Sequence, residues 1–128
     1  MDNRLFTLET TPIEIIEGDT VEIPYQVTTK NGGYVNLEEA IKKIEWRLNP
    51  YNCFGGEPLI KKTFINGDDP KAEGVVLSET SLDCFSVILN PDDTEGFAGL
   101  YTYQIIITSA DDVVTRRVQG NIHVWQKI

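Results

Sequence analysis

Alternation of apolar and polar residues is the dominant pattern along the chain. In Thr20–Thr29 every second residue from Val21 to Val27 is apolar, and similar alternation marks Asp83–Asn90, Gly99–Thr108 and Val113–Trp125. A period of two with one apolar face is typical of a half-buried strand. Asp83–Asn90 is fairly apolar on both faces, which favours a central position in a sheet. Turn-forming Gly, Asn, Asp and Pro residues separate these runs. The pattern therefore predicts strands joined by tight connections.

Two shorter runs, Leu59–Ile65 and Gly74–Leu77, predict short strands. The segment Leu37–Asn49 supports two interpretations. Several of its apolar residues recur at helical spacing, whereas Ile44, Trp46 and Leu48 alternate with charged residues as in a strand. We favour one short helical turn near residues 37–41 followed by a strand.

Together these segments predict an all-β fold, an antiparallel Ig-like β-sandwich of about seven strands. A closed barrel would satisfy the same pattern. The chain of 128 residues shows no linker or repeat, so we expect one domain, 1–128. The residues expected to form the core are Val21, Ile23, Trp46, Phe85, Val87, Tyr101, Tyr103, Ile105 and Val124.

Two residues predict local irregularities in these strands. Pro24 has no backbone N–H to donate, so we expect a sheet edge or a bulge there. Gly120 interrupts the apolar face of the last strand and suggests a bulge or a close contact.

Composition and charge narrow the classes of partner. The formal net charge of −9 argues against nucleic acid, because neutralising phosphates requires clustered Lys and Arg. The acidity favours solubility, or alternatively it favours binding to a basic partner. No apolar run is long enough to span a membrane, and the first residues lack the features of a secretory signal. We therefore expect synthesis in a cytosol, with Cys53 and Cys84 as unbonded thiols.

Candidate catalytic and metal chemistry is sparse. His123 is the single histidine and falls on the polar face of the last strand. No zinc, triad or phosphate-loop motif occurs. The acidic pairs Asp68–Asp69, Asp92–Asp93 and Asp111–Asp112 coincide with predicted turns, which Asp favours for local hydrogen bonds. We therefore expect no enzyme activity, no catalytic residues, no metal and no cofactor.

Three aromatic residues are the candidates for contact with a partner. Tyr51 and Phe54 lie in a glycine-containing loop, and Trp125 falls on a polar strand face. Exposed aromatic side chains suit protein contacts or stacking on a sugar. Local packing is the alternative for all three.

The last third of the chain carries a recognisable order of motifs. It reads ILNPDDT at 88–94, GLYTYQI at 99–105 and GNIHV at 120–124. This resembles the small β-sandwich structural proteins of tailed bacteriophages, including the N-terminal domain of baseplate upper proteins. The shared motifs mark turns and core positions, and the resemblance transfers no residue-level function.

The resemblance implies a virion structural protein of the tail, baseplate, neck or capsid, as a stand-alone adaptor or decoration subunit. Its partners would be other virion proteins in many symmetric copies. It would be made in the host bacterial cytoplasm and located in the virion. The alternative function is a carbohydrate- or ligand-binding β-sandwich that uses Tyr51, Phe54 and Trp125.

Overall fold

The computed structural model describes residues 6–8, 13–29, 32–51, 57–67 and 71–127, without the side chains of 6–8 and 116–119. The described strands are β1 (Phe6–Leu8), β2 (Ile13–Ile16), β3 (Val21–Thr29), β4 (Ile41–Pro50), β5 (Ile60–Ile65), β6 (Lys71–Glu73), β7 (Val75–Leu77), β8 (Cys84–Leu89), β9 (Gly99–Ser109) and β10 (Val114–Trp125). Two single helical turns are α1 (Leu37–Ala40) and α2 (Pro91–Thr94).

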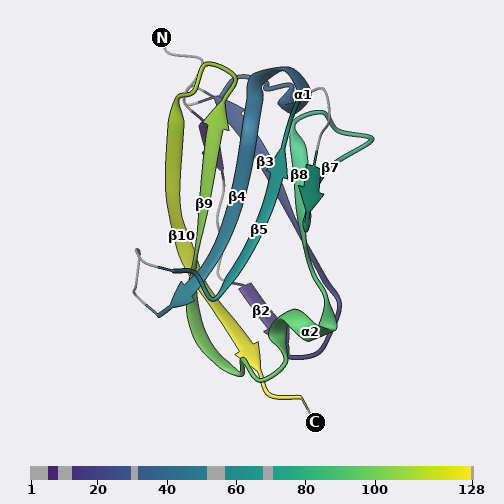
Figure 1. The fold of residues 1–128 in the computed structure, drawn as a ribbon, viewed down its shortest axis with the longest axis vertical. Coiled ribbons are helices and arrows are strands. Elements are labelled where there is room, and N and C mark those ends of the chain that lie inside the picture. The colour runs from purple at the N-terminus through teal and green to yellow at the C-terminus, as the bar shows by residue number, and fades with distance from the viewer. Residues whose placement is uncertain (1–5, 9–12, 30–31, 52–56, 68–70, 128) are drawn as a thin grey trace.

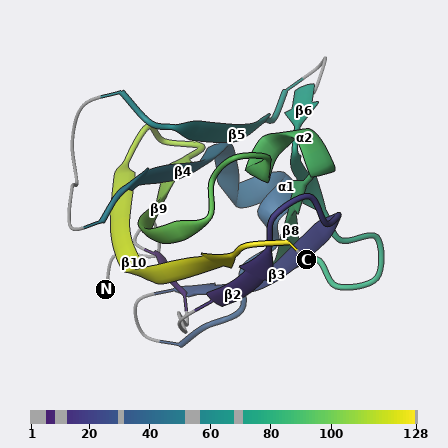
Figure 2. The same ribbon diagram turned by 90° about the horizontal axis from the view of Figure 1, so that it is seen from below.

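The strands form two sheets that face each other across the core. The four-stranded sheet has the order β1-β3-β8-β7, and the six-stranded sheet has the order β2-β10-β9-β4-β5-β6. Figure 1 shows the long strands running side by side, with α1 near one end and α2 near the other. Figure 2 shows β4 and β5 opposite β3 across the interior. The predicted all-β sandwich is confirmed, and its two separate sheets exclude the closed barrel.

The strand order matches that of a variable-type immunoglobulin domain. By position, β3, β4, β9 and β10 correspond to strands B, C, F and G, with β5 and β6 as the additional strands C′ and C″. The N-terminal part is divided between the sheets, because β1 pairs with β3 whereas β2 pairs with β10. The β2–β10 ladder is parallel, and the other ladders of the described strands are antiparallel.

The ambiguous segment at 37–49 divides as predicted. Leu37–Ala40 form α1, and the Asn36 side chain accepts a hydrogen bond from the Glu38 N–H at 3.1 Å. From Ile41 onward the chain is the strand β4, paired with β5 on one side and β9 on the other. Two neighbouring ladders fix the extended conformation and favour the period of two over the helical spacing.

Aromatic side chains occupy the centre of the core. Trp46 on β4 is fully buried, and its indole Nε1 donates a hydrogen bond to the Tyr25 hydroxyl at 3.2 Å. The ring centroids of Trp46 and Tyr103 are 6.0 Å apart, and those of Tyr25 and Tyr103 are 6.4 Å apart. In antibody domains a buried Trp on strand C packs against a disulfide between strands B and F. Tyr25 and Tyr103 lie on those two strands here, so a phenol pair fills this part of the core.

The phenols of this pair are held in their protonated forms. Burial raises the pKa of Tyr25, and the nearby Tyr103 adds to the rise. Burial also raises the pKa of Tyr103, while its hydrogen bond with Tyr25 acts in the opposite direction. Removing a phenol from water disfavours its charged form, so both hydroxyls stay neutral at ordinary pH.

Most of the predicted core residues are buried. Val21 and Tyr101 are the exceptions, being half-buried and packed against the edge of the core. The other seven are Ile23, Trp46, Phe85, Val87, Tyr103, Ile105 and Val124.

The predicted irregularities are also present. The β9–β10 register shifts between Val118 and Gly120, and Gly120 has a φ of 142°, so the bulge is confirmed. β1 pairs only with Val27–Thr29 of β3. Among the described residues, Pro24 therefore has a partner strand on one side only, namely β8, as at the edge of a sheet.

Asp111–Asp112 lies in a turn, as expected, whereas Asp92–Asp93 lies in the helical turn α2, which the sequence did not predict. Asp93 in α2 accepts hydrogen bonds from the Asn90 N–H at 2.6 Å and from the Lys62 ammonium at 2.7 Å. Asp111 and Asp112 form the turn between β9 and β10. Asp68–Asp69 lies outside the described residues.

Cys84 lies on β8 and is half-buried. Partial burial raises its pKa, and the neighbouring Asp83 carboxylate raises it further. Cys53 lies outside the described residues, so the absence of a disulfide stays a prediction.

Candidate protein interface

Large apolar side chains gather on the outer face of the six-stranded sheet at one end. Tyr51, Leu100 and Trp125 are about half exposed, at 47%, 46% and 50%, and Ile16 is exposed at 47%. We call these four residues the aromatic end patch. Single exposed apolar residues are ordinary on a protein surface, whereas a contiguous group marks a site of interaction.

The ladder register places the members of the patch side by side. Leu100 pairs with His123, and Trp125 pairs with Ile16. Pro50 pairs with Tyr101, so Tyr51 follows at the end of β4 beside Leu100. Neighbouring strands are roughly 4.8 Å apart, so the patch crosses four strands over about 15 Å.

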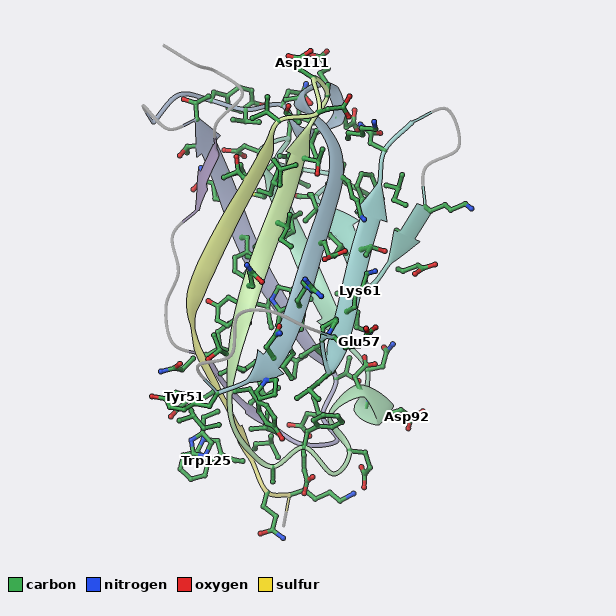
Figure 3. The ribbon with its side chains drawn as sticks, turned by 60° about the vertical axis from the view of Figure 1, so that its left-hand side comes forward. Tyr51, Glu57, Lys61, Asp92, Asp111 and Trp125 are labelled. Atoms are coloured by element: carbon green, nitrogen blue, oxygen red, sulfur yellow. The ribbon has the colours of Figure 1, made fainter. Side chains whose placement is uncertain are left out.

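Strand alternation turns these residues away from the core. Ile122 and Val124 are buried at 0% and 1% exposure, so the intervening His123 and the following Trp125 face outward. Figure 3 shows Tyr51 and Trp125 at the same end of the sheet. The ring centroids of His123 and Trp125 are 4.0 Å apart, which limits the freedom of the indole before any partner binds.

A buried carboxylate fixes the end of β10 that carries Trp125. Glu17 is 8% exposed, and its carboxylate accepts hydrogen bonds from the Gly96 N–H at 3.1 Å and the Lys127 N–H at 3.2 Å. The Glu17 N–H in turn donates to the Trp125 carbonyl at 2.9 Å. Glu17 therefore joins the chain after β2, the turn after α2 and the chain after β10.

The structure brings together two of the three aromatic residues singled out from the sequence. Tyr51 and Trp125 belong to the same patch, and Phe54 lies outside the described residues. The sequence did not reveal Leu100 or Ile16, because each is a single apolar residue whose neighbours across the ladder become known only from the sheet order. His123 faces outward, as its position on the polar face predicted.

Other described features offer less chemistry. An open hollow of about 440 Å³ near α1 is lined by Thr29, Gly33, Tyr34, Val35, Asn36, Glu39 and Ala40. Across the described side chains, no group of three His, Cys, Asp or Glu residues could hold a metal ion. The expected absence of a metal and of a cofactor stays a prediction. Neither of the two described helical turns has the length and apolar character to cross a membrane.

No protein-family model and no curated protein matches the chain. Among solved structures, a mutant of the SrpA adhesin from Streptococcus sanguinis is similar, with a TM-score of 0.54 and 14% sequence identity. The match covers 96% of this chain and 58% of the adhesin chain. The extracellular domain of the voltage-gated sodium channel beta4 subunit matches at a TM-score of 0.41 and 19% identity, over 92% of both chains.

The similarity to the adhesin shows a shared sandwich fold. The chain spans 58% of that protein's length, and at 14% identity the match carries no residue-level function.

Proposed function

We propose that this chain is a non-enzymatic protein-contact domain that joins a larger assembly through the aromatic end patch. The observation that carries the proposal is the register of the sheet, which places four exposed apolar side chains near one another on one face: Tyr51 follows the strand beside Leu100, and Trp125, paired with Ile16, lies two residues beyond His123, the partner of Leu100. Aromatic anchors of this kind dominate the energy of many protein interfaces.

The character of the described surface supports binding rather than catalysis. Tyr51 and Trp125 combine apolar rings with polar N–H or O–H groups, a combination enriched in protein interfaces. Both lie at the ends of long strands, and a rigid support lowers the entropy lost when a partner binds. The similar SrpA protein is an adhesin, which agrees with a sandwich of this type working by attachment.

The setting that we propose for this contact is the virion of a tailed bacteriophage. The support is the resemblance at 88–94, 99–105 and 120–124 to phage baseplate sandwiches. The chain would be made in the host bacterial cytoplasm and would meet other virion proteins in symmetric copies. The apolar patch would then be buried between subunits, and the net charge of −9 would keep the free subunit soluble.

A sugar-binding module is the second candidate function. The half-exposed indole of Trp125, with its orientation limited by His123, offers a surface on which a sugar ring could stack. Screening the purified protein against a glycan array tests this candidate. Binding of a defined glycan that is lost in Trp125→Ala would favour it over the assembly function.

The experiment that tests the assembly proposal is incorporation of variants into particles. Tyr51→Ala and Trp125→Ala are combined, and Tyr34→Ala serves as the control because Tyr34 is 67% exposed near α1, at the other end of the sandwich. An interface anchor contributes about 2 kcal/mol, and 1.4 kcal/mol corresponds to a tenfold change in affinity. We expect the double variant to reach less than a tenth of wild-type occupancy at limiting subunit concentration, while Tyr34→Ala matches the wild type. Equal occupancy of all three folded proteins would refute the proposal.

A further inference from the structure

A second feature lies on the same outer face, in the middle of the six-stranded sheet. The Glu45 carboxylate has three cations around it: Lys43 Nζ at 3.6 Å, Arg47 Nε at 3.4 Å and Lys61 Nζ at 3.6 Å. Charge-assisted hydrogen bonds are shorter, about 2.7–2.9 Å. Glu45 is therefore shared among the cations rather than tightly bound to one of them.

The charge of this cluster is opposite in sign to the net charge of the whole protein. Three cations share one carboxylate, whereas the chain carries a formal net charge of −9. The side chains of Glu45 and Arg47 are only 13% and 19% exposed, and Lys43 and Lys61 are exposed at 41% and 52%. Limited contact with water strengthens the attraction for an added negative charge.

The cluster borders a hollow that has an apolar component. The hollow has a volume of about 260 Å³. It is lined by Lys43, Glu45, Arg47, Ile106, Thr108 and Val114. Its polar groups come from β4 and β9, and Val114 adds an exposed apolar side chain from β10. Cations beside apolar side chains suit a carboxylate that is flanked by apolar atoms.

We propose that this hollow receives aspartate or glutamate side chains of the protein that docks on the aromatic end patch. The inference rests on the proposed function and narrows the partner to one with an acidic, partly apolar contact surface. Arg47 lies on the outward-facing side of β4, and Tyr51 directly follows the end of this strand. Asn49 and Thr102, which lie between the two sites on this face, are 2% and 3% exposed, so a partner that contacts both sites must extend over a covered part of the sheet. Figure 3 shows Lys61 nearer than Tyr51 to the end of the sandwich that carries Asp111.

A protein carboxylate fits this hollow better than a nucleic acid does. Nucleic-acid binding needs a track of cations spaced along a phosphate backbone, and it opposes the net charge of the chain. The described cluster is compact, contains its own carboxylate and adjoins Ile106 and Val114. A short acidic segment can place one carboxylate among the cations and its methylene groups on the apolar residues.

The test is an NMR titration of the ¹⁵N-labelled full chain with an acetylated and amidated hexaglutamate peptide. We expect shift changes centred on Lys43, Arg47, Ile106 and Val114. The double reversal Lys43→Glu with Lys61→Glu should weaken binding at least tenfold. The matched control reverses Lys42 and Lys71, which are exposed, do not line the hollow and do not pair with Glu45; Lys42 pairs instead with Asp112 in the turn before β10.

A third variant separates a built site from bulk electrostatic attraction. Glu45→Gln removes the carboxylate that competes with the peptide, so it should bind at least threefold more tightly. Equal losses in the two double reversals, shift changes spread over other faces, or tighter binding of a hexathymidine oligonucleotide or a heparin hexasaccharide would each overturn the inference. Thermal melts confirm that each variant is folded.

The peptide titration and the particle experiment can fail separately. If hexaglutamate does not bind the hollow while the Tyr51 and Trp125 variant loses occupancy, the acidic-partner inference is wrong and the assembly proposal stands. If the peptide binds as expected but the patch variant assembles normally, the assembly proposal is wrong and the inference about its partner falls with it.

Discussion

Raising the pH above 10 should destabilise the protein through its buried phenols. Burial raises the pKa of Tyr25 in the folded state, whereas the unfolded chain has the ordinary value of 10.0. A group whose folded pKa is raised contributes stability below its unfolded pKa and loses it as the pH rises further. If Tyr25 stays protonated in the folded protein, linkage at this one residue removes about 1.4 kcal/mol between pH 9 and pH 11. Tyr103 acts in the same direction, because its pKa is also raised.

The assay is urea unfolding at intervals between pH 8 and pH 11, followed by tryptophan fluorescence and compared with Tyr25→Phe. At pH 8 the variant should be less stable by about 1–3 kcal/mol, because the buried Trp46 N–H loses its acceptor. The difference between the two proteins should then shrink by about 1.4 kcal/mol by pH 11, because only the wild type carries the titrating phenol at position 25. Parallel stability curves across this range would refute the account of the phenol pair.

Three further predictions concern the fold. Glu17→Ala should lower the free energy of unfolding in urea by about 2–4 kcal/mol, because two backbone N–H groups lose a charged acceptor. Glu17→Gln should recover about half of that loss. Equal stability of the wild type and both variants would contradict this role of Glu17. Gly120→Ala should cost about 1–3 kcal/mol from backbone strain alone, because φ is 142° and, apart from its chain neighbours, no atom of the described residues lies within 4 Å of the added Cβ. An unchanged melting curve would show that the bulge relaxes freely. Intact mass under non-reducing conditions should equal that of the dithiol form, since a bond between Cys53 and Cys84 would remove two hydrogens.

The long strands could be predicted from the sequence because their alternation extends over six residues or more. Val21–Thr29, Cys84–Leu89, Gly99–Ser109 and Val114–Trp125 all coincide closely with the alternating runs. The competing helical spacing at 37–49 was decided correctly by Trp46 and its charged neighbours. The same pattern placed Trp46, Phe85 and Tyr103 in the core, because periodicity of two assigns whole faces of a strand.

The short edge strands β1, β2 and β6 were not predicted from the sequence. β1, β2 and β6 have three or four residues each, too few for a period to emerge, and they depend on pairing with longer neighbours. The parallel pairing of β2 with β10 joins residues more than 100 positions apart. No local pattern carries information about such a contact.

The aromatic end patch was only partly visible for the same reason. Tyr51 and Trp125 stood out as aromatic residues in a loop or on a polar face, but their proximity follows from the order β10-β9-β4. Leu100 joins them through the register of β9. The cluster around Glu45 likewise required the pairing of β4 with β5, which brings Lys61 opposite Arg47.

Site-specific photo-cross-linking tests the central claim most directly. A photoreactive phenylalanine analogue is placed at Leu100, in the middle of the aromatic end patch, and separately at Tyr34 near α1. The proteins are expressed during particle production and irradiated, and cross-linked products are identified by mass spectrometry. The account predicts that position 100 cross-links to a neighbouring virion subunit, with little product from position 34. Cross-links to such subunits from position 34 but not from position 100, or from neither position while the protein is present in particles, would contradict it.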